Sequence, residues 1–435
     1  MTTLSLLEQE AIQICQDLIR IPSVNFGDGK GDEKAVADYV VQSLSEVNIA
    51  ATIYESAPGR CNVVAMIPGR DSTRPGLVVH GHLDVVPANA DDWSVDPFCG
   101  DIIDAMIWGR GAVDMKNMDA MILATIREWS RVGYVPPRDI VLAFFADEEA
   151  GSIYGSHWMV DKHPEIFSGC TEAISEVGGF SVTVAGGKRL YMIETAEKGI
   201  HWMKLTAEGR AGHGSVMNDE NALTRLSQAV TNIGNHQWPQ RYSTTVKALF
   251  KRVAEATGKA YDEKDLRPLL SEVGFAARMI GATLQNTANP TMLEAGYKAN
   301  VIPGSASAVI DGRFIPGFED ELNETIKELI GAHITIETIT RDAALEVPFE
   351  GDLVDAMCKA ILNEDPEAIP VPYLMSGGTD NKALAELGII GYGFSPLKLH
   401  EDFDFMAMFH GVDERVPVEG ITFGVRVLKD FLENC

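Results

Sequence analysis

Short apolar segments and one helical pattern dominate the first part of the chain. Residues 62–67, 76–80 and 140–146 are apolar, are bounded by turn residues, and do not alternate with polar positions. This pattern is typical of strands that are covered on both faces, as in a parallel or mixed sheet. Residues 117–131 have helical periodicity. The order of these segments predicts an α/β fold with a mixed sheet flanked by helices.

An amphipathic helix is predicted near each end of the chain. Ser5 and Glu8 have the spacing of a capping box, and apolar residues then recur on one helical face as far as Pro22. Residues 421–432 repeat apolar positions on one face in the same way.

The pattern changes near Glu197. Residues 203–208 and 307–313 alternate apolar and polar positions, which is typical of antiparallel strands with one solvent-exposed face. A helix with one apolar face is predicted over 222–233, and residues 237–284 are rich in helix formers and are expected to add helices to the same insertion. The predicted domains are a main domain in two parts, residues 1–197 and 315–435, and an inserted α+β domain, residues 198–314.

The composition is that of a globular protein with an acidic surface. Apolar residues make up 46% of the chain, and the formal net charge is −27. A field of that sign repels phosphate backbones and anionic lipids, so it argues against nucleic acid and membrane partners. The first residues lack the pattern of a secretion signal, no apolar run is long enough to span a bilayer, and the six cysteines are scattered. We therefore expect a soluble, cytoplasmic protein.

His82 and Asp84 follow the apolar segment 76–80 and lie on the same side of a predicted strand. A histidine that binds a metal commonly donates its other N–H to a carboxylate, which suits this pair. The alternative is an ordinary hydrogen-bonded surface pair. His80 shares the same face, so either histidine is a candidate ligand on periodicity alone.

Acidic residues follow other apolar or glycine-rich segments. Asp114 comes just before the predicted helix, where an N-cap is the alternative to a metal ligand. Residues 147–149 are three consecutive acids at the end of an apolar strand; their mutual repulsion favours a cation, and a solvated loop is the alternative. Glu176 ends another short strand, and His410 lies late in the chain. Together these N and O ligands suit zinc, and they suffice for two ions if one carboxylate bridges.

Taken together, these motifs resemble the M20 metallopeptidase/aminoacylase family, which includes aminoacylases, glutamate carboxypeptidases, carboxypeptidase S and succinyl-diaminopimelate desuccinylase. The resemblance rests on residues 82–87, 109–116 and 147–149 and on Glu176, which occur in the family's order, and it covers nearly the whole chain. It implies a zinc-peptidase-like catalytic domain interrupted by a lid or dimerisation domain. It also implies that this chain hydrolyses amide bonds.

The resemblance assigns the metal ligands. His82 and Glu176 are expected to hold one Zn²⁺ ion, Glu149 and His410 the second, and Asp114 to bridge them. Co²⁺ and Mn²⁺ suit similar ligands.

Two further acids receive catalytic roles from the resemblance. Asp84 is expected to orient His82, and Glu148 to be the general base and acid for the metal-activated water. The sequence alone does not choose between Glu148 and Glu149 for the second role. The resemblance also implies a cis peptide bond between Asp114 and Met115.

The resemblance also supplies candidate residues for binding the substrate. In the lid, Asn300 and Arg313 are expected to bind the substrate, and the planar fork of Arg313 suits a substrate carboxylate. His213 is expected to polarise the scissile carbonyl in the site of a partner subunit, in a homodimer formed through the lid. In the main domain, Gly378 and Thr379 are expected to offer backbone N–H groups, with an ordinary turn as the alternative.

The predicted function is hydrolysis of peptides or N-acyl amino acids that carry a free carboxylate, as in a carboxypeptidase or an aminoacylase. A desuccinylase-type deacylase is the first alternative, although no cationic residues for a second acidic group are evident in the sequence. A catalytically inactive metal-binding scaffold is the second. All five ligands and Glu148 are present, which argues against that second alternative.

Overall fold

The three apolar segments become adjacent strands β2 (Arg60–Ile67), β6 (Ile140–Phe145) and β3 (Gly76–His82) in the computed structural model, which describes residues 3–27 and 29–435. Strand β6 runs antiparallel to β2 and parallel to β3. Every residue of β3 and β6 is buried, which explains the unbroken apolar pattern. The predicted mixed sheet is confirmed.

Ten strands make up this main sheet. Their order is β1-β2-β6-β3-β7-β18-β9-β16, and β8 and β17 also pair with β9. Strands β3, β6 and β7 are parallel, so their carboxyl ends lie at the same edge. The other strands are β1 (Ala51–Ala57), β7 (Cys170–Ser175), β8 (Phe180–Val184), β9 (Lys188–Glu197), β16 (Leu345–Glu346), β17 (Ile369–Met375) and β18 (Ile390–Gly393).

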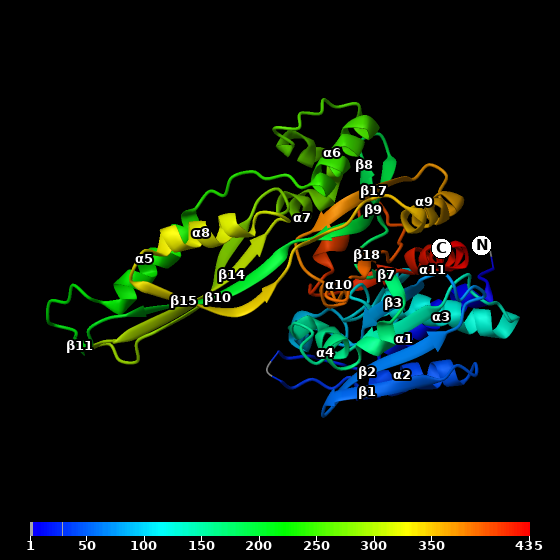
Figure 1. Cartoon of the computed structure of the whole chain (residues 1–435), viewed down its shortest axis with the longest axis horizontal. Helices are drawn as coiled ribbons and strands as arrows, with labels where there is room; N and C mark the ends of the chain where they lie inside the picture. Colours follow the sequence, from blue (N-terminus) through cyan, green and yellow to red (C-terminus); the bar gives the residue numbers. More distant parts are fainter. Residues whose placement is uncertain (1–2, 28) are drawn as a thin grey trace.

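Helices cover both faces of the main sheet (Figure 1). The larger apolar core includes residues of α1 (Leu6–Ile19), α2 (Lys34–Ser45), α3 (Lys116–Val132), α9 (Asp352–Glu364) and α11 (Val418–Asn434). The opposite face packs against the short helices α4 (Ser156–Lys162) and α10 (Asn381–Ala385). The capping box of α1 is present, with both Ser5 and Glu8 making the expected bonds.

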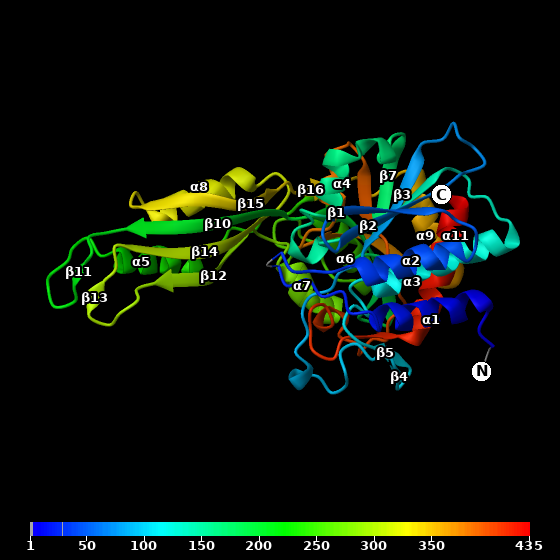
Figure 2. The same cartoon turned by 90° about the horizontal axis from the view of Figure 1, so that it is seen from below.

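A second, four-stranded antiparallel sheet extends away from the body that holds both termini (Figures 1 and 2). Its order is β12-β14-β10-β15, and α5 (Ala222–Asn235) and α8 (Glu319–Ile330) pack on it around a separate core. Strands β11 (Gly212–His213) and β13 (Val301–Ile302) pair at the far tip. The sheet strands are β10 (Gly199–Glu208), β12 (Thr287–Ala295), β14 (Ser305–Phe314) and β15 (Ile334–Asp342).

The limits of the second unit differ from the predicted range 198–314. Strand β15 lies beyond Phe314 and pairs with β10 along most of its length, so the sheet ends only at Asp342. The segment 237–284 also differs, because the buried apolar residues of α6 (Thr244–Thr257), η4 (Arg267–Ala276) and α7 (Ala277–Gly281) belong to the core of the main sheet. The high content of helix formers predicted these helices but did not reveal which sheet they contact.

Among the described residues, no helix combines the length and apolarity that crossing a membrane requires.

Candidate metal centre

The parallel strands bring three predicted ligand segments to one edge of the main sheet. His82 is the last residue of β3, residues 147–149 follow β6, and Glu176 directly follows β7. Because the carboxyl ends of parallel strands meet, side chains that are far apart in the sequence become neighbours here. This is the position at which α/β folds commonly carry their sites.

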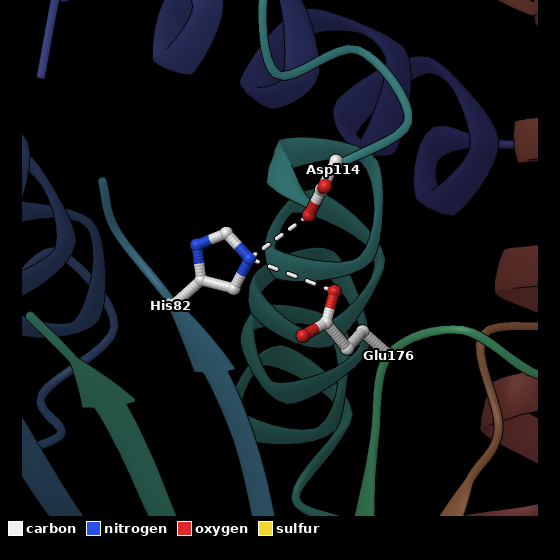
Figure 3. A group of neighbouring side chains, drawn as sticks. All are labelled: His82, Asp114 and Glu176. Carbon is white, nitrogen blue, oxygen red and sulfur yellow. Dashed lines mark hydrogen bonds and ion pairs between the residues drawn. The ribbon is translucent and has the colours of Figure 1, made fainter. Parts of the chain in front are cut away.

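Asp114 lies between the two histidines. One of its carboxylate oxygens, Oδ1, is 3.0 Å from His82 Nε2, and the other, Oδ2, is 3.2 Å from His410 Nε2. Glu176 Oε2 is 3.5 Å from the same His82 nitrogen. Figure 3 shows the carboxylates of Asp114 and Glu176 facing this side of the His82 ring. Glu149 Oε2 is 3.0 Å from His410 Nε2. Asp114 therefore belongs to both groups of ligand-type atoms, and within each group the atoms lie within 4.8 Å of one another.

The structure separates two alternatives that the sequence left open. His80 Nε2 is 2.9 Å from Asn381 Oδ1, and the ring lies against Phe145, so His80 is a buried residue of the sheet and not part of either group. Asp114 makes no capping bond to α3, whose N-cap position is Met115. The peptide bond between Asp114 and Met115 is cis, as the resemblance implied.

Asp84 lies behind this edge and holds the loop after β6. Its carboxylate accepts the backbone N–H groups of Glu148 and Glu149, each at 3.1 Å, and the side-chain amide of Asn25 at 2.9 Å. The backbone carbonyl of Asp84 is 3.0 Å from His82 Nδ1, closer than the carboxylate at 3.6 Å. Burial acts to raise the pKa of Asp84, but the bonds from His82 and Asn25 outweigh it and lower the pKa.

Two residues without an assigned role in the sequence hold the loop that carries Asp114. Glu414 is fully buried, pairs with Arg110 at 2.6 Å, and accepts the backbone N–H groups of Gly111 and Val113. Glu414 lies four residues after His410, so it connects the loops that carry two of the candidate ligands, Asp114 and His410. The position of Arg110 within the motif 109–116 was the available signal, but its partner Glu414 is 304 residues away in the sequence.

The carboxylates of the site are buried together. Burial and the neighbouring Glu176 raise the pKa of Glu148 well above its usual value, and burial raises the pKa of Glu176 to about 8. Hydrogen bonds to Asp114 and Glu149 raise the pKa of His410 to about 10. The buried oxygen Oε1 of Glu149 has no hydrogen-bond partner among the described residues. A divalent cation in each group would neutralise these carboxylates and be coordinated by their oxygens and by the histidine nitrogens, so the residues fit two metal ions.

Glu148 and Glu149 differ in position. Glu149 belongs to one ligand group, whereas Glu148 belongs to neither, and its Oε2 is 3.9 Å from His82 Nε2. Both line a cavity of about 330 Å³, together with the metal-ligand candidates Asp114, Glu176 and His410.

The predicted substrate residues are not gathered at one place. Gly378 lines the cavity, whereas the N–H and the hydroxyl of Thr379 are both bonded to Glu197. In the second unit, Arg313 makes a two-bond pair with Asp311.

The remaining two substrate candidates, His213 and Asn300, lie at the tip of the second unit, where β11 and β13 pair (Figure 1). Both are exposed. In Figure 1 this tip is the part of the molecule farthest from the main sheet, and the candidate metal ligands lie at the edge of that sheet.

Comparison with known proteins gives consistent matches. The model of Peptidase family M20/M25/M40 matches residues 78–434. A probable carboxypeptidase S-like 2 of Dictyostelium discoideum is 28% identical, covering 81% of this chain and 70% of its own length. An N-fatty-acyl-amino acid synthase/hydrolase of Bos taurus is 27% identical (96% and 86% covered), and human aminoacylase-1 is 25% identical (94% and 91%).

Solved structures share the fold. An M20 family metallo-carboxypeptidase from Sulfolobus solfataricus has a TM-score of 0.74 at 17% identity, with 98% of this chain and 99% of that chain covered. A dinuclear metal-binding M20 peptidase of Bacillus subtilis has a TM-score of 0.61 at 13% identity, with 98% and 97% covered. The arrangement of a main sheet with an extended second unit is therefore shared with these proteins.

Proposed function

This chain belongs to peptidase family M20/M25/M40 and is a hydrolytic enzyme of that type, and we propose that it cleaves the amide bond of peptides or N-acyl amino acids that carry a free carboxylate. The observation that carries the proposal is the position of Asp114, with one carboxylate oxygen facing each histidine. The names of the relatives, which include an aminoacylase and a carboxypeptidase S-like protein, support this substrate class.

The family and the ligand groups support a divalent metal cofactor, and we infer that it is a pair of Zn²⁺ ions. His82 and Glu176 would hold one ion, Glu149 and His410 the other, and Asp114 would contact both. When bound, such ions supply Lewis acidity and lower the pKa of water at the site.

Glu148 is the proposed general base and acid. It takes the proton of the attacking water and later gives that proton to the leaving amine. Its place in the cavity, outside both ligand groups, supports this role. The carboxylate of Asp84 accepts a hydrogen bond from the backbone N–H of Glu148, and it thereby positions the Glu148 side chain.

The free carboxylate of the substrate is assigned to the loop at Gly378 and to Arg313 of the second unit, and His213 is assigned to polarise the scissile carbonyl. His213 and Asn300 lie at the exposed tip of this unit, so their participation requires the tip of a second copy. We therefore propose a homodimer in which the second unit of one copy reaches the metal site of the other. Arg313 contributes by exchanging its pairing with Asp311 for the substrate carboxylate, which it grips with the same two donors.

The decisive experiment compares Glu148→Gln with Glu149→Gln. Metal content is measured by elemental analysis, and turnover by release of amine from a panel of N-acyl amino acids and dipeptides. Glu148→Gln is expected to keep both ions and to lose about 10²- to 10⁴-fold in kcat, whereas Glu149→Gln loses an ion. If Glu148→Gln keeps most of its turnover with both ions bound, the assignment of the base is wrong.

A further inference from the structure

The segment that was expected to enlarge the second unit instead reaches the metal site. Helix α7 packs against β17 of the main sheet, and η4 packs against the short helix η5 (Phe405–Ala407), just before His410. Figure 1 places α7 where the two parts of the molecule meet. Met279 on α7 lines the 330 Å³ cavity that also contains the metal-ligand carboxylates. Because α7 is part of the main core, Met279 belongs to a fixed wall of this cavity.

The wall around Met279 is apolar. Met375 at the end of β17 and Met406 and Phe409 beside His410 line the same cavity. Phe409 lies edge-on to the buried Phe405, with ring centroids 5.1 Å apart, so the wall is backed by the core. Methionine side chains are flexible and polarisable, and they adapt to unbranched apolar chains.

Val177 shows that the apolar wall is held in place. It follows the ligand Glu176 and lines the cavity with φ at 55°, a conformation that β-branched residues rarely adopt. The hydroxyl of Tyr373 donates to its carbonyl, and the next residue, Gly178, packs so closely that an added Cβ would lie 1.8 Å from Gly393 O. Strain of this kind persists where the surrounding structure enforces it, and it often occurs at functional sites.

Apart from the metal site itself, the described lining of the cavity contains no cationic side chain that could pair with an acidic acyl group. None of the described residues that line it is Lys or Arg, and apart from the metal-ligand set and Glu148 its lining is apolar or belongs to the loop 376–378. A second carboxylate on the substrate would therefore be buried against methionine without a partner, which is unfavourable.

We propose that Met279, Met406 and Phe409 form the acyl pocket of this enzyme. The pocket selects a long, uncharged aliphatic acyl chain over the short acetyl group and over the charged succinyl group. The inference rests on the proposed function, in which the loop 376–378 receives the free carboxylate of the amino acid. The acyl chain, on the other side of the scissile amide, then contacts the apolar wall. Met279, which lies on α7, is the specificity-determining residue.

The first test measures binding without turnover. Calorimetry on the metal-loaded full chain compares octanohydroxamate with acetohydroxamate, two metal-binding probes that differ only in their tails. Burial of each methylene strengthens binding about three- to fourfold, so the longer probe is expected to bind at least about tenfold more tightly. Equal affinity of the two probes would overturn the proposal.

Substitutions of Met279 test whether this residue causes the tighter binding of the longer hydroxamate. Met279→Lys is expected to weaken octanohydroxamate binding about tenfold or more, and acetohydroxamate binding less than about twofold. Met279→Ala, which keeps the cavity uncharged, is expected to weaken the longer probe to a smaller extent. The matched control is Met66→Lys at a methionine that is 52% exposed on β2, and it is expected to change neither affinity. Equal weakening of both probes by Met279→Lys would contradict the proposal.

An activity panel separates this inference from the proposed function. Wild type is expected to hydrolyse N-octanoyl-leucine with a higher kcat/KM than N-acetyl-leucine or N-succinyl-leucine. If no member of the panel is cleaved, the proposed function is wrong. The hydroxamate affinities still show whether the pocket binds an aliphatic chain. If all are cleaved without preference for the aliphatic chain, the acyl pocket fails and the hydrolytic function stands.

Discussion

Glu197 accepts two hydrogen bonds from Thr379, one from its backbone N–H at 3.0 Å and one from its hydroxyl at 2.6 Å. Glu197 is the last residue of β9, just before the chain enters the second unit. Lys382, on the helix after Thr379, donates to the carbonyls of Lys198 and Ala343, which lie on the two connections between the units. The loop that lines the cavity is therefore attached to both connections between the two units.

Thr379→Val tests this attachment. The substitution keeps the shape of the side chain but removes the hydroxyl donor, which leaves the buried Glu197 with one bond fewer. We expect a loss of about 1–3 kcal/mol in the free energy of unfolding, measured by urea denaturation. Thr335→Val, which removes an exposed hydroxyl bond on β15, is the control and is expected to change the stability by less than about 0.5 kcal/mol. Equal losses would mean that burial of the pair is unimportant.

Metal removal is expected to destabilise the protein. The buried carboxylates of Asp114, Glu149 and Glu176 repel one another, and bound cations relieve this repulsion. At about a thousandfold excess over the dissociation constant, a ligand contributes about 4 kcal/mol per site. Chelation with EDTA should lower the melting temperature in calorimetry, and Zn²⁺ should restore it. An unchanged melting temperature after verified loss of metal would contradict the two ligand groups.

Arg110→Met should be strongly destabilising. Its partner Glu414 is fully buried, and burial raises the pKa of Glu414 to about 7, so without the guanidinium this carboxyl would stay charged without a partner or take up a proton. The removal of one partner of such a buried pair costs about 3–5 kcal/mol. Because Glu414 also binds the loop before Asp114, metal affinity should fall as well. The control is Arg341→Met at the exposed pair with Glu319, for which we expect at most about 1 kcal/mol. Urea denaturation and metal titration of both variants provide the comparison.

The pair of Asp365 and Arg189 predicts a pH dependence of stability. Two hydrogen bonds from Arg189, each at 2.6 Å, lower the pKa of Asp365 to about 2, and the hydroxyl of Tyr191 adds a third. The carboxylate of an unfolded chain titrates near pH 3.9. The stabilisation is therefore complete above about pH 4 and is lost as the pH falls from about 4 towards 2.

Asp365→Asn checks the sign of this dependence. The difference in unfolding free energy between wild type and the variant should be constant from about pH 7 to 5 and should shrink as the pH is lowered towards 3. Denaturant unfolding at each pH measures it. A difference that grows on acidification would show that the pair does not stabilise the ionised form of Asp365.

Much of the architecture was predictable from local patterns. The capping box of α1, the buried strands β2, β3 and β6, and the alternation in β10 and β14 follow from periodicity, which depends only on residues close in sequence. The same patterns placed acids and histidines at strand ends, and so predicted that a site would lie at one edge of the sheet.

Other features depend on contacts between distant segments. Strand periodicity puts His80 and His82 on the same face, but only the packing of Asn381 and Phe145 around His80 removes it from the site. The membership of β15 in the second sheet and of α7 in the main core is likewise a matter of which surfaces meet.

By itself the sequence determined which residues are able to bind a metal and near which strand ends they lie, because ligand chemistry and periodicity are local properties. The resemblance predicted Asp114 as the shared residue, and the tertiary structure shows the contacts of its two oxygens with His82 and His410. Only the tertiary structure decided that Thr379 is bonded to Glu197 and that Met279 enters the cavity. The physical reason is that each of these relationships joins segments many residues apart, and their positions are set by the packing of the whole fold.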